Sequence, residues 1–225
     1  MMKRSKRRVK NVCGDAEGDG IIWHRGVRIH KNGRVDLQLR RAGLHRKNAR
    51  EQFMALDDYL KIVLKPVTHR SSGVCDVSCN RIDDKAVELL IEIVIKHHLL
   101  FRVIKLYDNN IQDGGGLAVA RYITWYPYGV DELNMSHNDM TAKGVAHIVA
   151  AYHQHPEKPY PWFNRKLNVF VPGFVRVDEN FAKIGGDIIN CLMTRKETMG
   201  WTGWTDNSQD LGPQRLAEVF IFIQF

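Results

Sequence analysis

Three consecutive glycines, Gly114, Gly115 and Gly116, are the first residues of this 225-residue chain that suggest chemistry. Glycine-rich turns at the start of a helix can hold a phosphate, because their bare backbone N–H groups point toward the anion. Neither G-x-x-x-x-G-K-[ST] nor G-x-G-x-x-G occurs around them. The triplet therefore gives little support to a nucleotide site, and the repeat pattern described below already accounts for small residues there.

Two other groups of residues resemble cation sites only in part. The segment D-N-N-I-Q-D-G from Asp108 imitates a calcium loop, but the sixth position is Asp113 instead of glycine and the twelfth is Val119 instead of an acid. The candidate zinc ligands are Cys75 and Cys79 with His69, and His153 with His155. A C-x-x-x-C spacing across a strand puts one thiol inward and the other at the turn, so we predict no metal and no cofactor.

No serine, histidine and acid arrangement in the sequence stands out from chance. A hydrolase therefore has no support, and we expect a protein that is not an enzyme.

Regularly spaced asparagines carry the strongest pattern in the chain. Asn80, Asn109 and Asn138 are 29 residues apart, and Asn168 follows after a step of 30. Two apolar residues, two positions apart, precede the first three asparagines, as a short strand with one buried face requires: Cys75 and Val77, Ile104 and Leu106, Leu133 and Met135. Self-similarity at this period predicts a solenoid, in which each unit buries its apolar face against the next.

The second half of each unit matches one face of a helix. Counted from the residue two past each asparagine, offsets 4, 5, 8, 9 and 12 carry small or apolar residues in all three copies, as a buried helix face requires. These residues are Ala86, Val87, Leu90, Ile91 and Val94, then Gly115, Gly116, Val119, Ala120 and Ile123, then Gly144, Val145, Ile148, Val149 and Tyr152.

The unit resembles the leucine-rich repeat L-x-x-L-x-L-x-x-N-x-L, and its length and helix-like second half look like the ribonuclease-inhibitor-type subclass. The resemblance covers residues 72–170. It implies a short right-handed α/β solenoid, with parallel strands on the concave face and helices on the convex face. It also implies a structural ladder, in which the asparagine side chains hydrogen-bond to the main chain of the turns: Asn80, Asn109, Asn138 and Asn168.

The chain divides into four parts by composition. We predict a disordered basic tail and linker at 1–20, an N-terminal cap at 21–70, the repeats at 71–170 and a divergent C-terminal cap or tail at 171–225. The tail is irregular from about residue 196, and the terminal V-F-I-F-I-Q-F either docks as a strand or is a sticky end.

The cap contains a predicted hairpin with two possible registers. A two-residue Asn32-Gly33 turn sets Ile29 against Asp36. A three-residue loop with Gly33 in the left-handed conformation sets Ile29 against Val35, and we prefer it because apolar then faces apolar. Alternatively, the segment from Leu37 to Leu44 is a degenerate first repeat; in either case a helix over residues 48–64 follows.

The strand residues that point away from the core form the predicted binding face. Parallel strands about 4.8 Å apart place these side chains in rows. The rows mix charges and aromatic residues, as protein-binding surfaces do. The predicted partner-binding residues are Arg40, Asp76, Lys105, Tyr107, Glu132, Asn134, Trp162, Asn164 and Lys166.

The net charge of +8 is unevenly distributed. Residues 1–50 hold 15 Lys and Arg against four acids, whereas the rest of the chain is slightly acidic. Met1 to Lys10 alone holds six positive charges. Such a basic run is typical of a nuclear import signal, a phosphate contact or a solubilising tail. No apolar run suits a membrane span or a secretory signal, and four cysteines without a paired framework favour a reducing compartment. We therefore expect an intracellular protein, cytoplasmic or nuclear.

Three functions remain open from the sequence. The first is a non-catalytic module that binds another protein through its concave strand face. We expect such a module to be a monomer and not to associate with a membrane. The second is a nucleic-acid or ribonucleoprotein accessory factor that uses residues 1–50. The third is a regulator similar in repeat length to the Ran GTPase-activating proteins, although no position here matches the loop residues on which that family relies.

Overall fold

The protein has an α/β fold built on a mostly parallel sheet. The computed structural model describes residues 26–64, 73–127, 130–155, 161–164, 169–180 and 221–224. Within these ranges the strands follow the order β1-β2-β3-β4-β5-β7-β6, and β8 also pairs with β7. The elements are β1 (Val27–Ile29), β2 (Val35–Gln38), α2 (Ala49–Val63), β3 (Gly73–Asp76), α3 (Asp84–Lys96), β4 (Phe101–Lys105), α4 (Asp113–Trp125), β5 (Glu132–Asn134), α5 (Ala142–Gln154), β6 (Pro161–Asn164), β7 (Val169–Arg176) and β8 (Ile221–Gln224).

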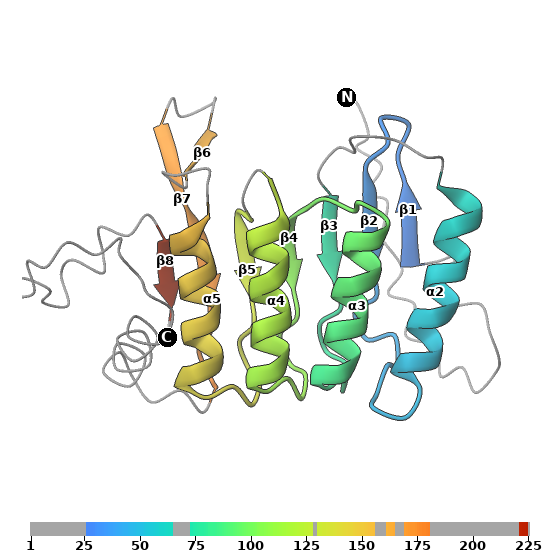
Figure 1. The fold of residues 1–225 in the computed structure, drawn as a ribbon, viewed down its shortest axis with the longest axis horizontal. Helices are drawn as coiled ribbons and strands as arrows, with labels where there is room; N and C mark the ends of the chain where they lie inside the picture. The colour runs from blue at the N-terminus through green and yellow to red at the C-terminus, as the bar shows by residue number, and fades with distance from the viewer. Residues whose placement is uncertain are drawn as a thin grey trace, which may run out of the picture.

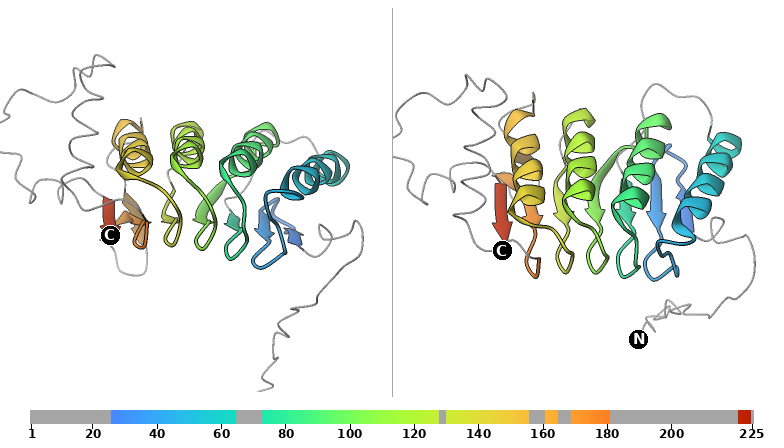
Figure 2. Two further views of the ribbon diagram at one scale, coloured as in Figure 1. Left: turned by 90° about the horizontal axis from the view of Figure 1, so that it is seen from below. Right: turned by 60° about the horizontal axis from the view of Figure 1, so that its bottom comes forward.

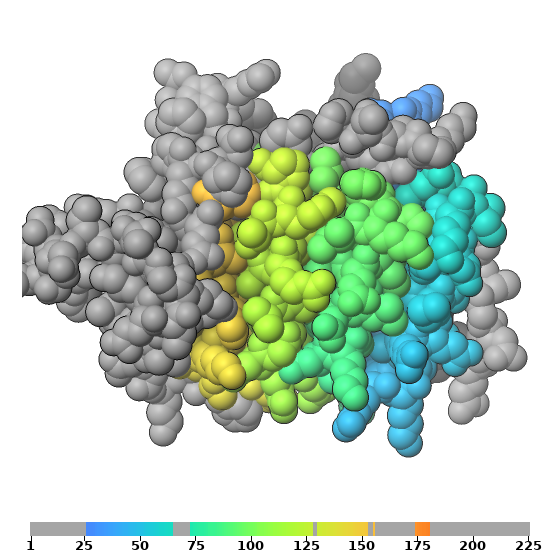
Figure 3. Space-filling view, viewed as in Figure 1, coloured from blue at the N-terminus to red at the C-terminus, as the bar shows by residue number. Residues whose placement is uncertain are grey.

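The four helices lie side by side on one face of the sheet, and each follows its own strand (Figure 1). Figure 2 shows the helices standing farther apart than the strands beneath them. Neighbouring strands need about 4.8 Å and packed helices about 8–10 Å, so the row curves toward its strands. Seen from the helix side, the helices form adjacent bands of surface (Figure 3).

The N-terminal hairpin has the register that places apolar residues opposite each other. Val27 pairs with Leu37 and Ile29 with Val35, and Gly33 has a φ of 79°. The predicted three-residue loop is therefore confirmed. Strand β2 also pairs in parallel with β3, so the hairpin opens the same row of strands that the repeats continue.

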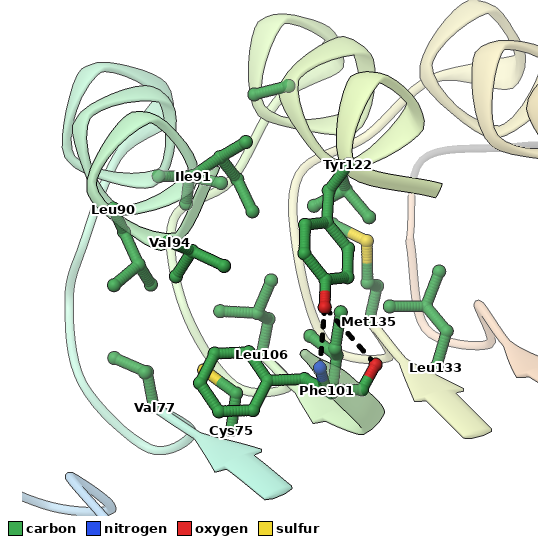
Figure 4. Packing of buried hydrophobic residues seen from close by; sticks show 14 of the residues in the cluster. Cys75, Val77, Leu90, Ile91, Val94, Phe101, Leu106, Tyr122, Leu133 and Met135 are labelled. Carbon is green, nitrogen blue, oxygen red and sulfur yellow. Dashed lines mark hydrogen bonds between the residues drawn. The ribbon is translucent and has the colours of Figure 1, made fainter. Parts of the chain in front are cut away.

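The core lies between the strands and the helices, and the helix faces predicted from the offsets are buried in it. Ile104 and Leu133 are parallel partners on adjacent strands, and both are buried with Leu106 and Met135. Figure 4 shows side chains from α3 and α4 pointing down onto these strand residues. Each unit thus buries its apolar face between its own helix and its neighbours.

A buried tyrosine that the offsets do not include joins α4 to the strand layer. The Tyr122 hydroxyl accepts a hydrogen bond from the Phe101 backbone N–H at 2.6 Å and lies 3.3 Å from the Phe101 carbonyl (Figure 4). It also lies 3.3 Å from the Leu99 carbonyl. Its ring stacks on Tyr126 with 5.6 Å between centroids. Buried phenol groups need such partners, so this contact fixes the height of the helix above the sheet.

The asparagine side chains connect successive turns. The Asn109 amide N–H groups donate to the Leu106 carbonyl of its own unit at 2.9 Å and to the Val77 carbonyl of the preceding unit at 3.1 Å. Its Oδ1 accepts from the Ile82 N–H at 3.3 Å. Asn80 and Asn138 make the corresponding bonds one unit earlier and one unit later. These bonds satisfy backbone groups that the buried turns would otherwise leave unpaired.

The next asparagine of the ladder after Asn138 is Asn180, not the predicted Asn168. The Asn180 Oδ1 accepts from the Met140 N–H at 3.0 Å, and its amide donates to the Met135 carbonyl at 2.9 Å. Asn168 itself lies outside the described residues. The reason is an inserted antiparallel pair, β6 with the first half of β7, which delays the next parallel strand. The sheet consequently continues beyond the predicted repeat boundary at residue 170.

Acidic residues at the helix starts link one helix to the next. The Asp84 carboxylate accepts the Gln112 N–H at 2.6 Å and the Gly114 N–H at 3.1 Å, which caps the start of α4 from α3. A Cβ at Gly114 would lie 2.6 Å from the same carboxylate. The glycine triplet is therefore occupied by a contact within the protein, and does not form an open phosphate cradle.

One buried carboxylate holds α2 against α3. Asp57 is 4% exposed and lies 2.8 Å from the Lys96 Nζ, 2.9 Å from the Lys61 Nζ and 2.7 Å from the His97 Nε2. Burial opposes ionisation, but the hydrogen bonds from Lys96, Lys61 and His97 outweigh it and hold the pKa of Asp57 well below its usual value.

We predict that Asn109→Ala lowers the free energy of unfolding by about 2–4 kcal/mol, because it leaves several buried backbone groups without partners. Urea denaturation checks this value. Asn110→Ala, at the exposed neighbouring position, serves as the control and should change stability by less than about 0.5 kcal/mol. Equal losses in both variants would contradict the role of the ladder.

We predict that Asp57→Asn destabilises the protein by about 1–3 kcal/mol at pH 7. Because the folded pKa is depressed, the wild-type advantage is complete above the unfolded aspartate pKa of about 3.9 and is lost as pH falls through the folded pKa. Unfolding curves between pH 7 and pH 2 measure it. The control is Asp58→Asn, since the exposed Asp58 pairs only at the surface with Lys61; an equal effect there would refute the prediction.

Candidate interaction face on the strands

The outward side chains of the parallel strands form three rows, which together are called the strand face below. The first contains Val74, Val103, Glu132 and Phe174, the second Gln38, Asp76, Lys105, Asn134 and Arg176, and the third Arg40, Ser78, Tyr107, Ser136 and Asp178. The rows follow directly from the parallel register, in which every second residue of a strand points to the same side.

The structure brings six of the nine predicted face residues into these rows, namely Arg40, Asp76, Lys105, Tyr107, Glu132 and Asn134. Trp162 and Asn164 instead belong to β6, which pairs antiparallel with β7, so they do not continue the rows. Lys166 lies outside the described residues. The places assigned to these three residues are taken by Phe174, Arg176 and Asp178.

Sequence reasoning missed Phe174 and Arg176, although a signal for them was present. Val175, Val177 and Asn180 have the same spacing as the two apolar positions and the asparagine of the other units. Val175 and Val177 are buried, as that spacing requires.

Tyr107 stands in the middle of the third row, between two small residues. Its neighbours in the third row, Ser78 and Ser136, are buried. The Arg40 guanidinium reaches across Ser78 and lies 5.5 Å from the centroid of the Tyr107 ring. A hydrogen bond with Cys79, followed by the nearby Tyr107, raises the pKa of Arg40. A permanent positive charge is thus stacked on an aromatic face, a contact that stabilises both side chains.

Short polar contacts fix the remaining charged side chains of the face. Lys105 Nζ on β4 lies 3.3 Å from the carboxylate of Glu132 on the adjacent strand β5. Arg176 Nε lies 2.6 Å from Asp178, and this hydrogen bond, with the charge of Arg176, lowers the pKa of Asp178. Positive and negative groups are therefore paired with each other on the face.

Two local hydrogen bonds also hold polar side chains at the ends of the strands. The Asp76 carboxylate accepts hydrogen bonds from the backbone N–H and hydroxyl of Ser78, and Asn134 does the same for Ser136. A face whose side chains are already ordered loses little rotamer entropy when a partner binds.

The face contains half-buried apolar residues beside these polar groups. Val74, Val103 and Phe174 are each partly exposed in the first row. Apolar area next to an aromatic residue and an arginine is the composition of protein-binding surfaces.

The candidate metal ligands that the structure describes do not converge. Among the described residues no group of three or more His, Cys, Asp or Glu is arranged to hold a metal ion. Cys75 is buried in the core and burial raises the pKa of its thiol, whereas Cys79 lies at the turn. The His155 imidazole is buried and bonded to the Tyr126 carbonyl at 2.5 Å. His69 and the His153 side chain lie outside the described part of the chain.

Part of the chain matches a known family of repeats. The model of the Leucine Rich repeat matches residues 130–149, which contain β5 and the first part of α5. The match supports a leucine-rich repeat protein. A search of curated proteins found no match to the chain.

The matched segment carries the same features as its neighbours. Leu133, Met135 and Asn138 occupy the strand and turn positions of the leucine-rich repeat, and Asn138 bonds to its own unit and to the preceding one. Leucine-rich repeats are commonly protein interaction modules. None of the described helices has the length and apolar character needed to cross a membrane.

We predict a measurable coupling between Arg40 and Tyr107. A double-mutant cycle with Arg40→Ala and Tyr107→Ala, followed by urea denaturation, should give a coupling energy of about 0.5–1 kcal/mol, as expected for a cation–π pair at the surface. A parallel cycle of Arg28→Ala with Tyr107→Ala should give none. A coupling of zero in the first cycle would show that the two side chains do not interact in solution.

Proposed function

We propose that this protein is a non-catalytic interaction module that binds another protein through its strand face. In this proposal the chain is a short right-handed solenoid of the ribonuclease-inhibitor-type subclass, monomeric and intracellular. The 29-residue units with one helix each support the subclass, and free cysteines at positions 75 and 79 suit a reducing compartment.

The Arg40–Tyr107 pair is the observation that carries the proposal. Tyrosine and arginine are enriched among the few residues that supply most of the binding energy at protein interfaces. Here they are stacked in the third row of the face, with the small buried Ser78 between them and Ser136 on the other side of the tyrosine. The first row, with its apolar Val74, Val103 and Phe174, lies on the same face beyond the second row.

The shape of the row also favours a protein partner. Because the sheet curves toward its strands, the strand face is concave, and a concave row of strands contacts an extended surface over several units. The charge pairs Lys105–Glu132 and Arg176–Asp178 leave the face nearly neutral. Apolar, aromatic and hydrogen-bond contacts, and not the net charge of the strand face, would therefore determine which partner binds.

The proposal predicts a partner that depends on the strand face. Affinity capture with the full chain at low and high salt identifies candidates that persist at high salt. Arg40→Ala together with Tyr107→Ala should weaken the interaction with such a partner by about tenfold or more, while the melting temperature changes little.

A matched control comes from the opposite side of the molecule. Leu117 is 42% exposed on α4, so Leu117→Ala removes a comparable exposed side chain from the helix face. Amide exchange of the complex should protect β3, β4 and β5. The proposal fails if Leu117→Ala has the same effect as the double variant, or if the double variant unfolds together with its loss of binding.

A further inference from the structure

A second surface lies at the edge of the molecule where the strands turn into the helices. A groove with a volume of about 720 Å³ runs along this edge, and its lining comes from the loops before α2, α3, α4 and α5. None of the residues lining it belongs to the strand face. The left-hand view of Figure 2 looks onto this edge from below, and the right-hand view shows it turned forward.

One end of the groove is rich in basic side chains. His45, Arg46 and Lys47 come from the loop before α2, and Arg81 and Lys85 come from the loop before α3 and its first turn. The backbone joins the two loops, because His45 and Arg81 form an isolated parallel bridge and the Arg81 N–H donates to the Leu44 carbonyl at 2.8 Å. The fold therefore gathers charges that are more than thirty residues apart in sequence.

The acids in the same groove are largely occupied by other contacts. The Asp84 carboxylate accepts the N–H groups of Gln112 and Gly114. Asp83 caps α3 by accepting the Ala86 N–H at 3.1 Å, and its second oxygen lies 3.4 Å from Arg46. The third acid, Asp139, belongs to the loop before α5, at the other end of the groove from the basic loops.

The remaining cations point to an anionic ligand. Lys47, Arg81 and Lys85 are all exposed, and within the described ranges no carboxylate lies within ion-pair distance of any of them. The Lys47 N–H donates to the His45 Nδ1 at 3.3 Å, so a neutral His45 carries its proton on Nε2 and can donate it outward. The exposed amides of Asn110 and Gln112 add further donors along the groove.

We propose that this groove binds the phosphate backbone of a single-stranded nucleic acid. Lysine, arginine and side-chain amides are the usual donors to phosphate oxygens. The cations are spread over two loops of an open groove, which suits successive phosphates better than one phosphate group held by converging arginines. No Phe, Tyr or Trp lines the groove, so the contacts go to the phosphates, which carry no sequence information, and the binding is not selective for sequence.

Neutralising the groove tests the proposal in the full chain. One variant carries Lys47→Gln, Arg81→Gln and Lys85→Gln; Arg46 is left unchanged because it pairs with the cap of α3. The control carries Arg28→Gln, Lys31→Gln and Arg121→Gln, which removes the same number of exposed charges from residues that do not line the groove. Both variants must melt within a few degrees of the wild type.

The measurement is fluorescence anisotropy with a labelled single-stranded RNA of 20 nucleotides and mixed sequence, over a series of salt concentrations. Each lost phosphate contact reduces the slope of log K against log salt by about 0.7 for a single strand. The groove variant should therefore lose about two units of slope, and the control should keep the wild-type slope.

Three results would overturn the proposal. Equal losses of slope in both variants would mean that net charge alone attracts the RNA. An unchanged slope in the groove variant would place the phosphate contacts elsewhere on the chain. Displacement of the RNA by an acidic or phosphorylated peptide of equal total charge, at equal concentration, would assign the groove to a protein ligand instead.

Discussion

The bonding of each turn to its neighbours through one asparagine side chain is the interaction on which this structure depends. A strand of three to five residues ends in a turn whose backbone groups are buried and have no ladder partners of their own. An amide side chain has both an acceptor and two donors, so a single asparagine can satisfy groups of its own unit and of an adjacent one. No aspartate or serine offers the same set. The fold is therefore stable only as a row.

This constraint explains why the sequence predicts the middle of the chain well. Asn80, Asn109 and Asn138 recur at a constant step, and the apolar positions around them repeat with the same phase. Each copy is an independent test of the same assignment, so strands, helix faces and the hairpin register were all predictable. Tyr122 escaped because it falls outside the five offsets that the copies share, although its hydroxyl bonds to Phe101 and Leu99 much as the Tyr152 hydroxyl bonds to Val130 in the next unit.

The end of the row could not be predicted by extending the step. Asn168 fits a step of 30, yet the rung belongs to Asn180, 42 residues after Asn138. An antiparallel pair inserted between α5 and the next parallel strand costs the fold little, because it projects from the row and leaves the ladder intact (Figure 1). The number of residues between two rungs thus depends on the length of the connecting segments. The short motif around Asn180 depends instead on the buried contacts that each unit must make. Searching for the motif at any step would have found Phe174 and Arg176.

The two surfaces differ in how the protein satisfies their charges, and this difference separates the ligands that they suit. On the strand face, Lys105 and Arg176 have acidic partners on the face itself, so a ligand there gains mainly from apolar and aromatic contact. At the loop edge, Asp84 is bound by backbone N–H groups of α4 because it caps that helix. The acid that would neutralise the neighbouring cations is therefore committed to holding the helices together. Because Asp84 caps α4, it does not pair with Arg81 or Lys85, and these two cations can bind a ligand. The same contact therefore stabilises the row of helices and leaves positive charge at this edge.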